Sequence, residues 1–192
     1  MKKIILLLLF AGNFCYSQAG NKLNNLAEAA LQLTEQKVTY DPSYFSIPYP
    51  NGDVPSTVGV CTDVVIRAYR KLGIDLQKEV HEDMKANFLK YPKLWGLKTT
   101  DKNIDHRRVP NLMTYFKRNY AEKPITQNPI DYLPGDIVCW NLGGAITHIG
   151  IVSNQKSNDN MRYKIVHNIG AGQVLQDCLF DFKIIGHYRY LP

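Results

Sequence analysis

Apolar and polar residues follow the period of an α-helix in four segments of the first two thirds of the chain. These segments cover residues 21–37, 61–72, 76–90 and 107–119. Gly73 follows the second segment and Pro92 follows the third, and both residue types commonly end helices. Residues 38–60 combine aromatic residues with Pro and Gly and fit no period, so we expect an ordered loop or arm there.

Beyond Pro134-Gly135 the pattern changes to short β-rich runs separated by turn residues. The expected strands are Ile137–Leu142, Ile149–Ser153, Tyr163–His167, Val174–Phe180 and Ile184–Tyr190. Strands that follow one another with short turns predict an antiparallel meander. The order of elements therefore predicts an α+β fold, with N-terminal helices packed on a C-terminal antiparallel sheet of about five strands.

The N-terminus has the pattern of a secretory signal peptide. Met1-Lys2-Lys3 is followed by an uninterrupted apolar run, Ile4–Ala11. As a helix this run would span about 12 Å, against roughly 30 Å for a bilayer core, so we expect no transmembrane anchor. Cys15 and Ser17 suit the −3 and −1 positions of a signal peptidase site.

We therefore predict cleavage after Ser17, a single domain over residues 18–192, and export to the periplasm or the extracellular space. Lipidation at Cys15 is a less favoured alternative, because the preceding Phe14 is bulky. A buried N-terminal strand or helix is another.

Composition narrows the class of protein. The chain has 192 residues, of which 45% are hydrophobic and 21% charged, which excludes a disordered chain. The formal charge of +6 would fall to +4 on loss of Lys2 and Lys3. No long run of Lys and Arg marks a nucleic-acid surface, so we expect no nucleic-acid partner. A monomer is expected.

The cysteine count is odd once Cys15 is removed with the signal peptide. Cys139 and Cys178 lie in apolar stretches and could be buried thiols or form a disulfide. Cys61 begins a predicted helix, on the stripe that faces the rest of the protein. Unpaired backbone N–H groups and the helix dipole there favour the reactive thiolate, whereas Asp63 opposes it unless paired. The alternative is a buried structural cysteine.

Two histidines flank a predicted hairpin. His148 opens one arm and His167 closes the other, so the two residues should be neighbours. If paired residue numbers sum to an odd value, His167 shares the face of His148; if even, Asn168 does. Either residue could orient His148 as the base for a Cys61 nucleophile. The alternatives are two unrelated histidines, or a zinc ion held by Cys61, His148 and His167.

Short motifs through residues 38–190 resemble one bacterial family, DUF1287, whose name records a domain of unknown function. They are Val60–Val65 (VCTDVV), Asn103–Val109 (NIDHRRV), Pro134–Val138 (PGDIV), His148–Val152 (HIGIV), Val166–Gly172 (VHNIGAG) and Gly186–Tyr190 (GHYRY). That family is similar to the NlpC-type cysteine peptidases of the papain-like superfamily, which cleave peptide bonds in bacterial cell walls. Cys61, His148 and His167 fall on the positions of its Cys, its His and its third polar residue. Val-Cys-Thr here departs from the Asp-Cys-Ser of the NlpC pattern.

The resemblance implies a secreted cysteine hydrolase that cleaves amide bonds in peptidoglycan stem peptides through a thioester acyl-enzyme. It implies neither a metal nor a cofactor. His148 would take the proton of Cys61, or the two would rest as an ion pair. An acyltransferase or esterase on the same scaffold is one alternative. A non-catalytic cell-envelope binding module is another.

Candidate substrate-binding residues are Asp63, Tyr49, Asp105 and Arg107. The arm residues Tyr40, Asp41, Tyr44 and Asp53 could line the cleft or simply pack over the helix. Asp105, Arg107 and Arg108 could bind a substrate carboxylate, but we expect them to form ion pairs with one another. Trp95, Trp140 and His187 are expected to be structural.

Overall fold

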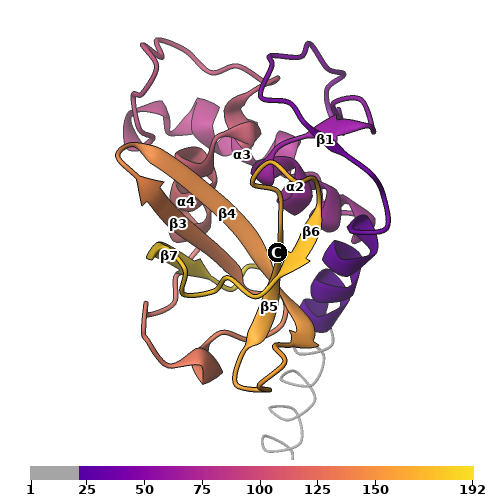
Figure 1. Cartoon of the computed structure of the whole chain (residues 1–192). Coiled ribbons are helices and arrows are strands. Elements are labelled where there is room, and N and C mark those ends of the chain that lie inside the picture. The colour runs from indigo at the N-terminus through magenta and orange to yellow at the C-terminus, as the bar shows by residue number, and fades with distance from the viewer. Residues whose placement is uncertain (1–21) are drawn as a thin grey trace, which may run out of the picture.

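The computed structural model describes residues 22–192. The predicted signal peptide, the Ser17 cleavage site and Cys15 lie outside these residues. The described chain begins in a helix over residues 22–33 and continues through an arm to the helices and sheet of Figure 1. Within residues 22–192, no helix has the length and apolar character needed to cross a membrane.

The other helices are α2 (Cys61–Lys71), α3 (Leu76–Ala86) and α4 (Val109–Arg118). Their positions agree with the predicted segments, and the main difference is that the first helix and α3 each end four residues before the predicted segment does. Asn87 ends α3, and a separate 3-10 turn, Phe88–Lys90, follows it. A further 3-10 turn, Asp105–Arg107, leads into α4, whose second residue is Pro110.

The sheet contains β3 (Ile137–Gly143), β4 (Ile146–Lys156), β5 (Tyr163–His167), β6 (Val174–Gln176) and β7 (Lys183–Tyr188), in the order β6-β5-β4-β3-β7. All pairs are antiparallel. The fold is therefore α+β, as predicted.

The expected five-strand meander is wrong at its last step, because β7 returns to pair with β3 instead of β6. The predicted fourth strand also stops at Gln176. Cys178 and Leu179 turn inward into a hydrophobic cluster, and this turn carries the chain back across the sheet.

The sheet has a hydrophobic core on each face. On one face it packs against α2 and α4, which α3 contacts in turn, and this larger core includes Cys61, Val65, Cys139 and Ile149. On the other face lies a smaller cluster: Tyr132, Val138, Trp140, Val152, Ile165, Cys178, Leu179 and Ile184. Trp140 is a core residue, since its indole N–H donates to Leu179 O at 2.9 Å. Only side chains that lie in the same core, on the same face of the sheet, can contact one another.

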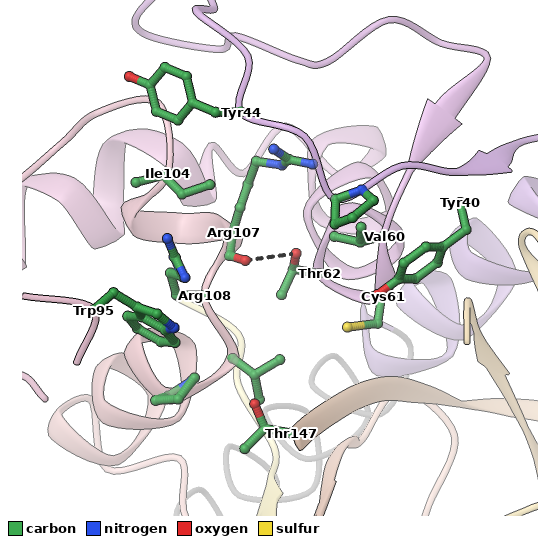
Figure 2. Close-up of a pocket in the computed structure, with 13 residues that line it drawn as sticks. Tyr40, Tyr44, Val60, Cys61, Thr62, Trp95, Ile104, Arg107, Arg108 and Thr147 are labelled. Atoms are coloured by element: carbon green, nitrogen blue, oxygen red, sulfur yellow. Dashed lines mark hydrogen bonds between the residues drawn. The ribbon is translucent and has the colours of Figure 1, made fainter. Parts of the chain in front are cut away.

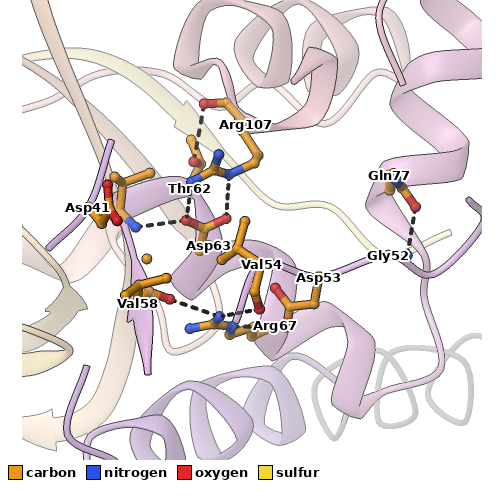
Figure 3. A network of polar contacts seen from close by, with 12 residues as sticks. Asp41, Gly52, Asp53, Val54, Val58, Thr62, Asp63, Arg67, Gln77 and Arg107 are labelled. Atoms are coloured by element: carbon orange, nitrogen blue, oxygen red, sulfur yellow. Dashed lines mark hydrogen bonds and ion pairs between the residues drawn. The ribbon is translucent and has the colours of Figure 1, made fainter. Parts of the chain in front are cut away.

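Residues 38–60 form the ordered arm that the sequence predicts. Its ends are β1 (Thr39–Tyr40) and β2 (Val58–Gly59), which pair in parallel beside the start of α2. Polar contacts hold the segment between them, as Figure 3 shows. Arg67 of α2 binds Asp53, and Gln77 of α3 accepts a hydrogen bond from Gly52 N. The arm is thereby fixed over the N-terminal end of α2.

Candidate functional site

Cys61 is the first residue of α2 and lines a cavity of about 260 Å³ (Figure 2). Its side chain is only 7% exposed. The cavity is bounded by the arm, by the segment that leads into α4 and by β4. Its lining residues are Tyr40, Pro42, Tyr44, Val60, Cys61, Thr62, Trp95, Ile104, Arg107, Arg108, Val109, Pro110 and Thr147. The thiol therefore faces a space that a small part of a ligand can enter.

The backbone of α2 and β4 surrounds the Cys61 sulfur with amide donors. The N–H groups of Cys61 and Thr62 at the helix start, and that of Ile149 on β4, lower the pKa of the thiol. Ile149 directly follows His148 in the sequence. The sulfur is therefore in contact with β4 at the residue after the predicted base.

Asp63 and Arg107 are each other's partners. Nε and Nη2 of Arg107 donate to the two carboxylate oxygens of Asp63 at 2.9 and 3.0 Å (Figure 3). The same carboxylate accepts from Val60 N at 2.7 Å, so it also caps α2. Asp63 is 2% exposed and does not line the cavity. The Asp63 carboxylate is therefore engaged within the fold, whereas Arg107 does reach the cavity wall.

The surroundings of Cys61 do not favour a thiolate at rest. The pKa of Cys61 is raised to about 12, because burial outweighs the amide donors and Asp63 adds to the rise. Burial also lowers the pKa of His148 to about 3, with a further contribution from His167. Near neutral pH both groups are uncharged. Of the two resting states left open above, the neutral thiol and imidazole are favoured over the ion pair.

The register of the β4–β5 hairpin decides between His167 and Asn168, which the sequence left open. Ile151 pairs with Val166 and Val152 with Ile165, so paired numbers sum to an odd value and His167 shares the face of His148. Nε2 of His148 lies 2.8 Å from Nδ1 of His167. Asn168, the alternative partner, points elsewhere and donates to Gly59 O at 3.1 Å. His167 is therefore the residue that orients His148.

Gln176 of β6 extends this chain of hydrogen bonds. It pairs opposite Ile165, so its side chain shares the face of His167, and its Oε1 lies 3.0 Å from His167 Nε2. An acceptor at this position assigns the proton to His167 Nε2, which makes Nδ1 an acceptor for the His148 Nε2–H. Nδ1 of His148 then carries a lone pair, which is what a general base needs. No pattern in the sequence marks Gln176 as part of this chain of hydrogen bonds.

The predicted hydrogen bond between Cys61 and His148 is absent from the described structure. Side chains alternate along β4, so Ile149 faces the α2 core and His148 faces the opposite cluster, with its ring 5.7 Å from that of Trp140. The hydrogen bond to His167 holds it there. Nδ1 of His148 forms no hydrogen bond with any residue of the described chain. The structure therefore pairs His148 with His167 and shows no contact between His148 and the Cys61 sulfur.

Two other predicted substrate-binding residues lie away from the cavity. The Tyr49 hydroxyl donates to Glu82 on the surface of α3. Asp105 is buried against His81, with Oδ2 2.8 Å from Nδ1. Neither lines the cavity, so the structure does not bring them together with Cys61.

Of the arm residues, two make polar contacts within the protein and two line the cavity. Asp53 binds Arg67 and Arg70 of α2, and the Asp41 carboxylate accepts a hydrogen bond from Ser43 N. Tyr40 and Tyr44 do line the cavity. The hydroxyl of Tyr40 points toward the Cys61 side chain in Figure 2.

Cys139 and Cys178 do not form a disulfide. All three cysteines of the described chain are free and buried, with Cys139 in the α2 core and Cys178 in the opposite cluster. His187 is structural, as expected, because it binds Asp136 and stacks on Tyr132. Within residues 22–192, no group of His, Cys, Asp or Glu side chains is arranged to hold a metal ion.

The comparison with known proteins agrees with the motifs. The family model described as "Domain of unknown function (DUF1287)" matches residues 27–190. The chain belongs to the DUF1287 family. It is similar to the protein named "Uncharacterized protein YijF" of Escherichia coli (strain K12), with 51% identity over 165 residues, or 86% of this chain and 80% of YijF. No solved structure matches the chain.

Proposed function

We propose that this DUF1287 protein is an exported cysteine hydrolase of the NlpC-like, papain-like type, and that it cleaves amide bonds in peptidoglycan stem peptides. The observation that carries the proposal is the position of the Cys61 sulfur. It opens on a cavity, is surrounded by backbone amides at the start of α2, and contacts β4 at the residue after His148. The His148–His167–Gln176 chain then supplies a neutral base of defined tautomer.

The proposed reaction starts from neutral groups. As the sulfur of Cys61 attacks the substrate carbonyl, its proton passes to Nδ1 of His148, and the amine leaves with that proton as the thioester forms. Water then attacks the thioester while His148 accepts its proton, which releases a carboxylic acid and restores the thiol. We assign stabilisation of the developing oxyanion to the backbone N–H of Cys61 and the Tyr40 hydroxyl, which both lie beside the sulfur.

This reaction requires His148 to approach Cys61 more closely than it does in the structure. Catalytic hydrogen bonds are commonly longer without substrate and shorten in the reactive complex. A side-chain rotation alone does not suffice, because His148 and Cys61 lie on opposite faces of the sheet. The reaction therefore requires β4 to rearrange locally at His148, next to the residue that the sulfur already contacts.

The test is digestion of purified muropeptides, followed by mass spectrometry. Wild-type protein should cleave one kind of amide bond, Cys178→Ala should cleave the same bond, and Cys61→Ala should leave the substrate intact. Cleavage by Cys61→Ala at the wild-type rate would exclude this mechanism.

A second candidate is a cell-envelope binding module. The missing Cys61–His148 hydrogen bond and the raised pKa of Cys61 favour it. It predicts that wild-type protein and Cys61→Ala bind peptidoglycan equally well and that neither cleaves it.

A further inference from the structure

Arg107 and Arg108 are adjacent in sequence, and their guanidinium groups have opposite surroundings. Arg107 is buried and bound through two hydrogen bonds to Asp63. Arg108 lines the cavity, and within residues 22–192 its guanidinium forms no ion pair and no hydrogen bond. Burial lowers the pKa of Arg108, and the neighbouring charge of Arg107 contributes. Even so lowered, an arginine keeps its charge at neutral pH.

The carboxylates closest to Arg108 are already used by other groups. Asp101 accepts hydrogen bonds from the Tyr44 hydroxyl at 3.0 Å and from Asn103 N at 2.9 Å. Asp105 is held by His81 and by Asp101 N. These two acids act on Arg108 only as distant charges. The protein therefore keeps a cation in the cavity wall and gives it no counter-ion.

Trp95 fixes the position of this cation. The guanidinium carbon of Arg108 lies 3.9 Å from the centre of the Trp95 ring, a close cation–π contact (Figure 2). Trp95 has a φ of 58°, in the left-handed region that bulky residues rarely adopt. Its side chain is 55% exposed, so the backbone cost is not offset by burial in a core. One face of the guanidinium is thus covered, while its N–H edges remain available.

We propose that Arg108, held by Trp95, is a carboxylate-binding subsite of the Cys61 cavity, and that the ligand is a peptide with a free carboxylate near the amide bond that Cys61 attacks. A guanidinium matches a carboxylate through two parallel N–H···O bonds, which gives both affinity and orientation. This inference rests on the proposed function for the attack by Cys61. The carboxylate-binding part can be tested without turnover.

The test measures the dissociation constant of the Cys61→Ala variant for a synthetic stem tetrapeptide, by calorimetry. The probe is used with all carboxylates free and with all converted to primary amides. We expect amidation to weaken binding by roughly 10- to 100-fold. Peptides amidated only at the C-terminal α-carboxylate, or only at a side-chain carboxylate, then show which group Arg108 binds. This comparison changes only the ligand, so it does not depend on the folding of a variant.

The matching protein change is Arg108→Gln in the Cys61→Ala background. It should weaken binding of the free-acid peptide as much as amidation does and leave binding of the amidated peptide unchanged. Lys85→Gln, on the exposed surface of α3, removes the same charge outside the cavity and should leave both constants within about twofold.

The subsite is excluded if amidation has no effect, if Arg108→Gln weakens both peptides equally, or if neither peptide binds. Failure of the proposed function gives a different result. Carboxylate-dependent binding through Arg108 without cleavage by the wild-type protein supports the subsite and contradicts the hydrolase. Cleavage with no preference for the free acid supports the hydrolase and contradicts the subsite.

Discussion

Cys61 and Cys178 are buried on opposite sides of the central sheet, and the surroundings of their thiols differ in kind. Cys61 begins a helix, contacts three backbone amides and lines a cavity. Cys178 lies in the opposite cluster, with its sulfur 3.6 Å from Nε2 of His167, and lines no described cavity. Burial raises the pKa of both thiols to about 12. Cys178 thus has the contact with a histidine, whereas Cys61 has the access to a ligand. We infer that access identifies the nucleophile, which is Cys61.

The largest expected effect is the difference between two alanine substitutions, one at Cys61 and one at Cys178. Cys61→Ala should lower kcat/KM for the cleaved muropeptide by at least about 10³-fold, because the acyl-enzyme cannot form. Cys178→Ala should keep kcat/KM within about threefold of the wild-type value, since Cys178 contacts His167 only at Nε2, the nitrogen that does not face His148. Thermal unfolding of both variants checks that neither effect comes from loss of the fold. The opposite ranking would make Cys178 the nucleophile.

Removal of the base should have the next largest effect. His148→Ala should lower kcat by about 10²- to 10⁴-fold, the usual contribution of a positioned general base. Labelling of Cys61 by a small alkylating reagent should change little, because at rest the thiol makes no hydrogen bond to His148. A parallel fall in activity and in alkylation would instead indicate a resting ion pair.

Gln176 should act through the two histidines. The pKa values of His148 and Cys61, about 3 and about 12, predict a flat kcat/KM between about pH 5 and 9. Gln176→Glu places a carboxylate beside His167 Nε2, which stabilises imidazolium and raises the histidine pKa values. The variant should therefore lose activity as the pH falls through the raised pKa, at a pH where the wild type is still active.

Gln176→Met serves as the matched control for the charge. It should lower kcat about tenfold at every pH, since it removes the acceptor and adds no charge. An unchanged pH profile for Gln176→Glu would contradict the relay.

The smallest expected effect concerns the stability of the protein in acid. It compares His106, on the helix side of the sheet, with His148. His106, 1% exposed beside α4, has its pKa lowered to about 3 by burial, like that of His148. Below about pH 6.5 each histidine takes up a proton in the unfolded chain but stays neutral in the folded protein. As the pH decreases, the free energy of unfolding should therefore decrease by about 1.4 kcal/mol per pH unit for each histidine.

Chemical denaturation between pH 7 and pH 4 measures this slope. His106→Asn should reduce the pH dependence of the free energy of unfolding by about 1.4 kcal/mol per pH unit, the contribution of one histidine, and leave cleavage unchanged. A slope identical to that of the wild type would show that His106 does not stay neutral in the folded protein.

Local pattern was enough to predict the helices, the strands and that His148 and His167 are neighbours, because helix period, strand alternation and a hairpin connection are set by nearby residues. The register that selects His167 over Asn168 stayed open, since it depends on the β4–β5 pairing. The position of β7 depended instead on how Cys178 and Leu179 are buried, which no local pattern contains. Gln176 has no strong sequence signal either, since a glutamine on a short strand commonly faces solvent. Its role follows from a contact across two strands.

The electrostatics were harder to predict than the fold. The helix start at Cys61 suggests a thiolate, but the desolvation that reverses this depends on the arm and β4 closing over the sulfur. Arg107 and Arg108 are the same residue type one position apart, and only their directions after the 3-10 turn separate an ion-paired residue from an unpaired one. Trp95 was expected to be structural, and its contact with Arg108 is what changes that interpretation.

The central claim is that Cys61 forms a covalent acyl-enzyme, and peptide mapping of acid-quenched protein tests it most directly. After brief mixing with a cleaved stem peptide, wild-type protein should carry the acyl fragment on the peptide that contains Cys61, and hydroxylamine should remove it. Product formation with no adduct on Cys61, or with the adduct on Cys178, would contradict the account.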